Sequence, residues 1–196
     1  MIVDMPMLPT PLPRALVRGS AAAALGALFL MSSPGSAMAV TDGSRGVSLT
    51  VTATSPAAAS SPLPAGWRRE MLDRVNGVRA AVGVAPVHAC AALRRSAQEY
   101  AMVMASTNTY GHVGPDGTQP WDRMTRQGYR WRSASENIAA GQRAVQQVVD
   151  AWITSPRHYA TLVNPRLRHV GFGFAFNAGS TYRAYWVQDF GLGSGC

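Results

Sequence analysis

The feature that most constrains the fold is a pair of β-favouring runs near the end of the chain. Residues 169–176, HVGFGFAF, place phenylalanine at every second position from Phe172, with small residues between. Residues 181–191, TYRAYWVQDFG, form a second run rich in aromatic residues, and the turn-rich residues 177–180 join the two. This alternation and the short connection predict an antiparallel hairpin of half-buried strands. A hairpin with one apolar face must be covered by other elements.

The residues before the hairpin can supply that cover as helices. Residues 66–83, 90–108 and 143–155 repeat apolar residues at helical spacing, and residues 119–128 suit a short helix with Pro120 in its first turn. In the first segment the apolar stripe faces inward and the arginines are expected on the opposite face. Residues 134–141 are a candidate for a short third strand. Helices followed by a hairpin predict an α+β domain with helices packed on a small sheet.

Residues 1–39 have the organisation of a secretory signal peptide. Two arginines precede the apolar run at residues 21–31, and small residues at Ala37 and Ala39 form a cleavage site. The alternative, an uncleaved anchor, is disfavoured because a spanning helix needs roughly 20 apolar residues. Residues 40–64, rich in Ser, Ala and Pro, are expected to be a linker. The folded domain is therefore expected over residues 65–196, in a secreted or periplasmic protein without a further membrane-spanning segment.

The cysteine content agrees with export. Cys90 and Cys196 are the two cysteines of the chain, and an even pair in an oxidising compartment predicts one disulfide. The alternative is two free or buried thiols.

The charge does not indicate a nucleic-acid partner. The formal net charge is +8, and all 18 basic residues are arginine. They are spread along the chain, with doublets only at Arg68-Arg69 and Arg94-Arg95, whereas a nucleic-acid binder usually concentrates its basic residues on one face.

Four titratable residues lie near the ends of predicted helices or among apolar residues, where a polar side chain needs an explanation. His112 follows the second helical segment, Asp122 lies in the short helix, Glu136 is flanked by apolar residues, and His158 begins a short helical stretch. Two imidazoles and two carboxylates suit a divalent metal or proton transfer. The plainer alternatives are that His158 hydrogen-bonds a helix start and that Glu136 pairs with an arginine. The spacing alone is weak evidence, because no pair forms a local motif such as HExxH.

Four fragments, in this order, resemble the CAP superfamily, which comprises cysteine-rich secretory proteins, antigen 5 and pathogenesis-related 1, in its bacterial single-domain form. They are YGHVGPDGTQPWDRM, SENIAAG, AWITSPRHYATLVNPRLRHVGFGF and YRAYWVQDFG. The resemblance extends from Trp67 to Gly193. It implies the SCP-domain fold, an α-β-α sandwich with helices on both faces of a small antiparallel sheet, and we expect a monomer.

The resemblance also implies a central cleft. His112 matches the family's first histidine, Glu136 the glutamate of its GENIA element, and His158 its second histidine. Asp122 is the nearest counterpart of a fourth, acidic position. The two histidines would be the ligands of Zn²⁺ or another divalent cation. SPRHYATL departs from the family's SPGHRxN, so the rim of the cleft is expected to be bulkier.

Three classes of function remain open. The favoured one is a secreted binding module whose groove holds a small apolar ligand, such as a lipid, or a peptide, and whose cleft binds a metal. The second is a metal-dependent hydrolase with Glu136 as base. The third is a purely structural envelope protein. The binding module is favoured because the sequence offers no oxyanion hole and no nucleophile with an assigned base.

Overall fold

The computed structural model describes residues 2–3 and 63–196. The predicted signal peptide and linker lie outside these residues, apart from 2–3 and 63–64, and stay predictions. In chain order the elements are β1 (Ile2–Val3), α1 (Trp67–Ala81), β2 (His88–Ala89), α2 (Ala91–Thr107), α3 (Pro120–Arg126), β3 (Arg130–Ala140), α4 (Val145–Thr154), α5 (Pro156–Leu162), β4 (His169–Phe176) and β5 (Ala184–Ser194).

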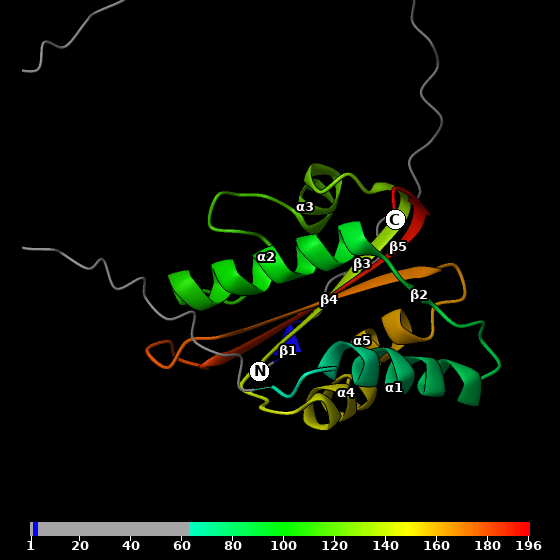
Figure 1. The fold of residues 1–196 in the computed structure, drawn as a ribbon, viewed down its shortest axis with the longest axis horizontal. Coiled ribbons are helices and arrows are strands. Elements are labelled where there is room, and N and C mark those ends of the chain that lie inside the picture. The colour runs from blue at the N-terminus through cyan, green and yellow to red at the C-terminus, as the bar shows by residue number, and fades with distance from the viewer. Residues whose placement is uncertain (1, 4–62) are drawn as a thin grey trace, which may run out of the picture. The chain divides into compact units, whose positions relative to one another are not determined.

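The strands form one sheet in the order β1-β3-β5-β4-β2. The predicted hairpin is confirmed, because β4 and β5 pair antiparallel, and β5 also pairs antiparallel with β3. The third strand is longer than expected and spans Arg130–Ala140. The short β2 pairs parallel with the start of β4. The α-β-α sandwich is confirmed, with α2 and α3 on one face of the sheet and α1, α4 and α5 on the other (Figure 1).

Glycine and phenylalanine alternate along β4, so the two faces of this strand pack against different helices. Phe172 and Phe174 enter the core under α1, where Phe174 packs edge-on against Trp67. Gly171 and Gly173 face α2, which lies directly on them. A Cβ added at Gly173 would lie 2.0 Å from the carbonyl oxygen of Ala97. The glycines between the phenylalanines therefore let α2 approach the sheet at backbone distance.

One arginine contradicts the expected amphipathic pattern of α1. Arg79 is fully buried instead of lying on the solvent face. Its guanidinium donates hydrogen bonds to four backbone carbonyls, those of Ala85, Leu162, Asn164 and Leu167. Carbonyls at the end of a helix and in the loop after it have no partner within the helix, and Arg79 satisfies those at the end of α5. The prediction that the arginines of α1 are all exposed was wrong for this reason.

The predicted disulfide is present. Cys90 precedes α2 as its N-cap residue and is bonded to Cys196, the last residue described, across a sequence separation of 106. The bond ties the residues that follow β5 to the start of α2 and holds both at one edge of the fold.

The close approach of α2 to β4 gives a stability prediction. Gly173→Ala should lower the free energy of unfolding by about 1–3 kcal/mol, because the new methyl group meets helix backbone that cannot move aside locally. Gly179→Ala is the matched control, since its Cβ would meet only the Asn177 side chain at 3.4 Å. Urea unfolding of the two variants measures the difference, and equal midpoints would contradict the proposed contact.

Candidate functional site

A buried polar cluster lies between β3 and the α2–α3 layer. Glu136 of β3 places Oε1 at 2.8 Å from Nδ1 of His112, and its Oε2 accepts a hydrogen bond of 2.8 Å from Arg123 of α3. All three side chains are buried. Both carboxylate oxygens of Glu136 are therefore occupied, one by an imidazole and one by a guanidinium.

Arg123 holds the cluster together. It also donates to the carbonyls of His112 and Thr118, and its guanidinium carbon lies 3.4 Å from the centre of the Tyr100 ring. The arginine thus fixes the loop that carries His112 and supplies the positive charge that a buried carboxylate needs. One alternative considered from the sequence was that Glu136 pairs with an arginine, and the structure shows this pair with Arg123.

A second carboxyl group, which sequence reasoning missed, lies beside Glu136. Asp189 of β5 is directly opposite Glu136 in the sheet register and is completely buried. Within the described residues neither of its oxygens makes a hydrogen bond of normal geometry, although Ser96 and Glu136 are its polar neighbours. Burial, and then the charge of Glu136, raise the pKa of Asp189 well above its usual value. The only hint in the sequence is an aspartate inside an apolar strand.

His158 approaches β3 from the other side. Its Nδ1 lies 2.7 Å from Oγ of Ser155, the N-cap residue of α5, and its carbonyl accepts a hydrogen bond from Asn137. Asn137 follows Glu136 directly in β3, and successive strand side chains point to opposite faces. The structure therefore brings His112 and Glu136 together, and it joins the His158 backbone to Asn137, whose side chain points to the other face of β3.

Asp122 has a different position. It lies at the start of α3, where its carboxylate accepts the backbone N–H of Gln119 at 3.0 Å. The Gln119 side chain in turn bonds the N–H of Asp122, which completes a capping box. The acidic group nearest to the cluster on the sheet is thus Asp189.

The fit of a metal ion can be tested on these contacts. Among the described residues, no group of three or more His, Cys, Asp and Glu side chains is placed to hold one. The guanidinium of Arg123 against Glu136 would also repel a cation bound there. The cluster as it stands does not fit a multidentate metal site, and the zinc hypothesis for His112 and His158 stays a prediction.

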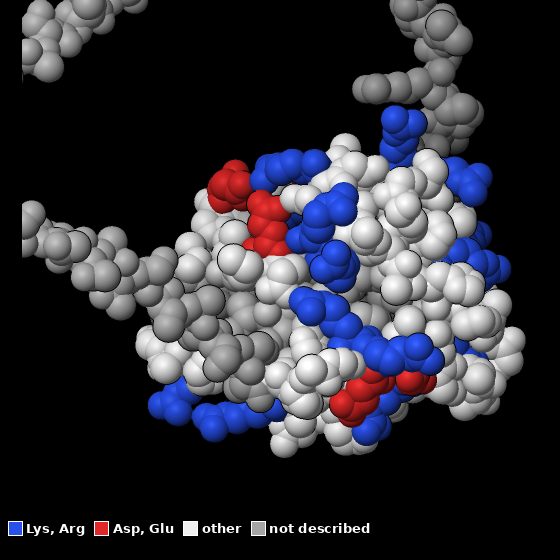
Figure 2. Space-filling view, viewed as in Figure 1, with Lys and Arg blue, Asp and Glu red and all other residues white. Residues whose placement is uncertain are grey.

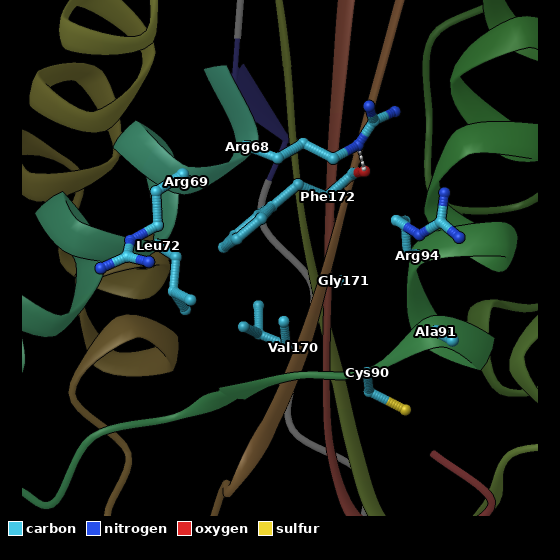
Figure 3. Close-up of a pocket in the computed structure, with 10 residues that line it drawn as sticks. Arg68, Arg69, Leu72, Cys90, Ala91, Arg94, Val170, Gly171 and Phe172 are labelled. Carbon is cyan, nitrogen blue, oxygen red and sulfur yellow. Dashed lines mark hydrogen bonds between the residues drawn. The ribbon is translucent and has the colours of Figure 1, made fainter. Parts of the chain in front are cut away.

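A cavity of about 470 Å³ lies between α1 and α2, where β2 leaves the edge of β4 (Figure 3). Its walls are mainly apolar and come from Leu72, Ala89, Val170 and Phe172. Three arginines, Arg68, Arg69 and Arg94, are also part of the lining. A smaller cavity of about 230 Å³ adjoins Tyr100 and Arg123. Sequence reasoning predicted an apolar groove without locating it.

The raised pKa of Asp189 predicts a pH dependence of stability. A carboxyl group whose pKa is higher in the folded than in the unfolded state destabilises the fold as pH rises above its unfolded value, near 3.9. Asp189→Asn cannot ionise and keeps a donor toward Glu136. Its stability relative to wild type should therefore increase from about pH 4 toward neutral pH, by about 1.4 kcal/mol for each pH unit until the pH reaches the pKa of the folded state.

Urea unfolding at a series of pH values measures this difference for Asp189→Asn. The exposed Asp150→Asn is the matched control for a simple loss of charge. A difference between Asp189→Asn and wild type that does not change with pH would show that Asp189 is ionised in the fold.

Comparison with known proteins identifies similar sequences. Residues 72–190 match the model of the cysteine-rich secretory protein family, CAP. The chain is 31% identical over 124 residues to the uncharacterized protein YkwD of Bacillus subtilis (strain 168). That match covers 63% of this chain and 46% of YkwD, so the chain spans about half the length of this relative.

Two solved structures share the fold. An outer surface protein from Borrelia burgdorferi superposes with a TM-score of 0.57 at 22% identity, over 65% of this chain and 92% of that one. An extracellular protein containing a SCP domain from Bacillus anthracis gives a TM-score of 0.57 at 22% identity, over 63% of this chain and 39% of that one. Within the described part of the chain, no helix is both long and apolar enough to cross a membrane.

Proposed function

The chain belongs to the cysteine-rich secretory protein family, and from that premise we propose that it is an exported binding protein that holds a small apolar ligand between α1 and α2. The observation that carries the proposal is the cavity of about 470 Å³ with its mainly apolar walls. Pockets for small molecules are typically concave, apolar and of about 300–1,000 Å³, with a few polar groups that orient the ligand.

Several features support export. The N-terminal residues have the pattern of a signal peptide, and the disulfide requires an oxidising compartment to persist. Two proteins with the same fold are described as an outer surface protein and an extracellular protein.

The contacts of Glu136 favour binding over hydrolysis. A general base must accept a proton from water, and both oxygens of Glu136 are already engaged by His112 and Arg123. The apolar cavity also lies apart from this cluster, because Glu136 and His112 are not among its lining residues.

A cavity-filling substitution tests the binding proposal. The fluorescence of an environment-sensitive apolar dye, titrated with the purified exported protein, should show saturable binding that Leu72→Trp abolishes by filling the cavity. Val78→Trp on the same helix is the matched control, because Val78 does not line the cavity. Equal dye affinity in wild type and Leu72→Trp, or no saturable binding in wild type, would refute the proposal.

A second candidate function is metal binding by the two histidines. The observation in its favour is that both have Nδ1 in a hydrogen bond, His112 to Glu136 and His158 to Ser155. Such a bond orients an imidazole so that Nε2 can be the ligand atom. Bound Zn²⁺ would act as a Lewis acid.

Calorimetric titration of Zn²⁺ tests this candidate. Wild-type affinity should fall severely in His112→Ala and in His158→Ala, because each would remove one ligand of the ion. His88→Ala and His169→Ala are controls, since His88 is exposed and His169 bonds the Tyr129 hydroxyl. No binding by wild type above about pH 7 would reject the candidate.

A further inference from the structure

One edge of the sheet is covered over only a small part of its length. β3 has 11 residues and pairs along one side with β5, from Arg130 to Ala140. On its other side the short strand β1 pairs with Ile138 and Ala139 only (Figure 1). Residues 2–3 belong to the predicted signal peptide, so cleavage after Ala39 removes β1. The exported protein then has no described strand on the outer edge of β3.

The pairing with β5 shows which backbone groups of β3 point to this edge. Directly after β3, Gly141 donates its N–H to the carbonyl of Ala184, so these two residues form a hydrogen-bonded pair with β5. Bonding residues alternate along an antiparallel strand, and therefore the backbone N–H and carbonyl groups of Ile138 and Glu136 point away from β5. The indole N–H of Trp152 reaches the carbonyl of Ile138 from α4, which agrees with this direction.

The outward backbone groups of Glu136 are the ones that most need a partner. The residue is 2% exposed, and no hydrogen bond from a described residue reaches its outward N–H or carbonyl. Buried backbone groups are almost always paired. A strand longer than β1, laid antiparallel along the same edge, would bond Ile138 and then Glu136 with every second residue. The edge of β3 is therefore arranged for one more strand.

The surroundings of the edge determine which strand fits. Opposite residues in a sheet share a face, so side chains opposite Ile138 and Ala139 meet one apolar cluster on each face. Figure 2 shows basic side chains extending across the face between α1 and α2. Along the edge itself, residues 133–140, Glu136 has the one charged side chain, and Arg123 neutralises it. The edge therefore favours an uncharged segment with β-branched apolar residues at the end that meets Ile138 and Ala139.

We propose that the outer edge of β3 binds an extended, uncharged segment of a partner protein, which adds a strand antiparallel to β3. In this mode of recognition, main-chain hydrogen bonds supply the affinity and the alternating side chains supply the specificity. A segment of about seven residues reaches from Ala140 to Ala134, because residues pair one to one along two strands. The inference goes beyond the proposed function, since no residue of β3 lines the apolar cavity.

A labelled peptide tests the proposal on the purified exported protein. The probe is TIVTTTS, acetylated at its first residue and carrying a fluorophore beyond its last, and fluorescence anisotropy measures its affinity. In the proposed register its first residue lies opposite Ala140, its third opposite Ile138 and its fifth opposite Glu136. Binding should be saturable, and Leu72→Trp should bind the peptide as wild type does, because the cavity is not involved.

Methylation of the peptide's own N–H groups separates strand addition from other modes of binding. N-methyl groups at the third and fifth residues remove the bonds to Ile138 and Glu136, and they should weaken binding about tenfold or more. N-methyl groups at the second and fourth residues point away from β3. This matched control should keep the affinity of the unmodified peptide within about threefold.

Hydrogen exchange locates the added strand on β3. Bound peptide should slow the exchange of the outward N–H groups of Ile138 and Glu136 by about tenfold or more, because they become hydrogen-bonded. The N–H groups of Ala139 and Asn137 point to β5, so they are the internal control and should not change.

The outcomes distinguish this inference from the proposed function. It is overturned, while the apolar cavity stands, if the unmodified peptide shows no saturable binding or if the two methylated peptides lose affinity equally. Unchanged exchange at Glu136 with bound peptide also overturns it. If sedimentation shows that the exported protein is a dimer that the peptide dissociates, the occupant of the edge is a second copy of the chain, and the partner protein is rejected. Peptide binding without dye binding would refute the cavity proposal alone.

Discussion

The close approach of α2 to β4 is the contact on which the rest of this fold depends. Gly171 and Gly173 leave room for the backbone of the helix, and any side chain there would overlap it. The position of α2 then sets two features at once. Its first turn, fixed by the disulfide at Cys90, forms one wall of the cavity. Its middle lies over the polar cluster, where Tyr100 stacks on Arg123. A single row of glycines thus positions both candidate sites.

The polar cluster under α2 shows how the fold tolerates buried carboxyl groups. A charge transferred to an apolar interior costs several kcal/mol unless it is paired and hydrogen-bonded. Glu136 meets this condition through His112 and Arg123. Asp189 lies opposite and has no such partner among the described residues, so burial raises its pKa well above the usual value and favours the neutral acid. The two neighbouring carboxyl groups are therefore not equivalent, because Arg123 donates a hydrogen bond to Glu136 and none to Asp189.

The sequence predicted those elements whose evidence is local. Periodicity along the chain identified the helices and the hairpin, and the paired cysteines identified the disulfide. The pairing of His112 with Glu136 was expected only from the family resemblance, since 24 residues separate them. Patterns of spacing cannot show which carbonyls or charges a distant strand brings to a side chain. For that reason Arg79 was placed on the wrong face, and the neighbour of Glu136 on β5 was not recognised.

The three uses of arginine in this domain follow from what surrounds each side chain. Arg79 is buried among carbonyls and donates to four of them, and Arg123 is buried beside a carboxylate and neutralises it. Both side chains serve the fold itself. Arg94 has the same chemistry, yet the described residues offer it neither a carbonyl nor a carboxylate, while Arg68 nearby adds a like charge. Arg94 is exposed, so water can satisfy its guanidinium, and the same side-chain chemistry needs a protein partner only where burial removes water.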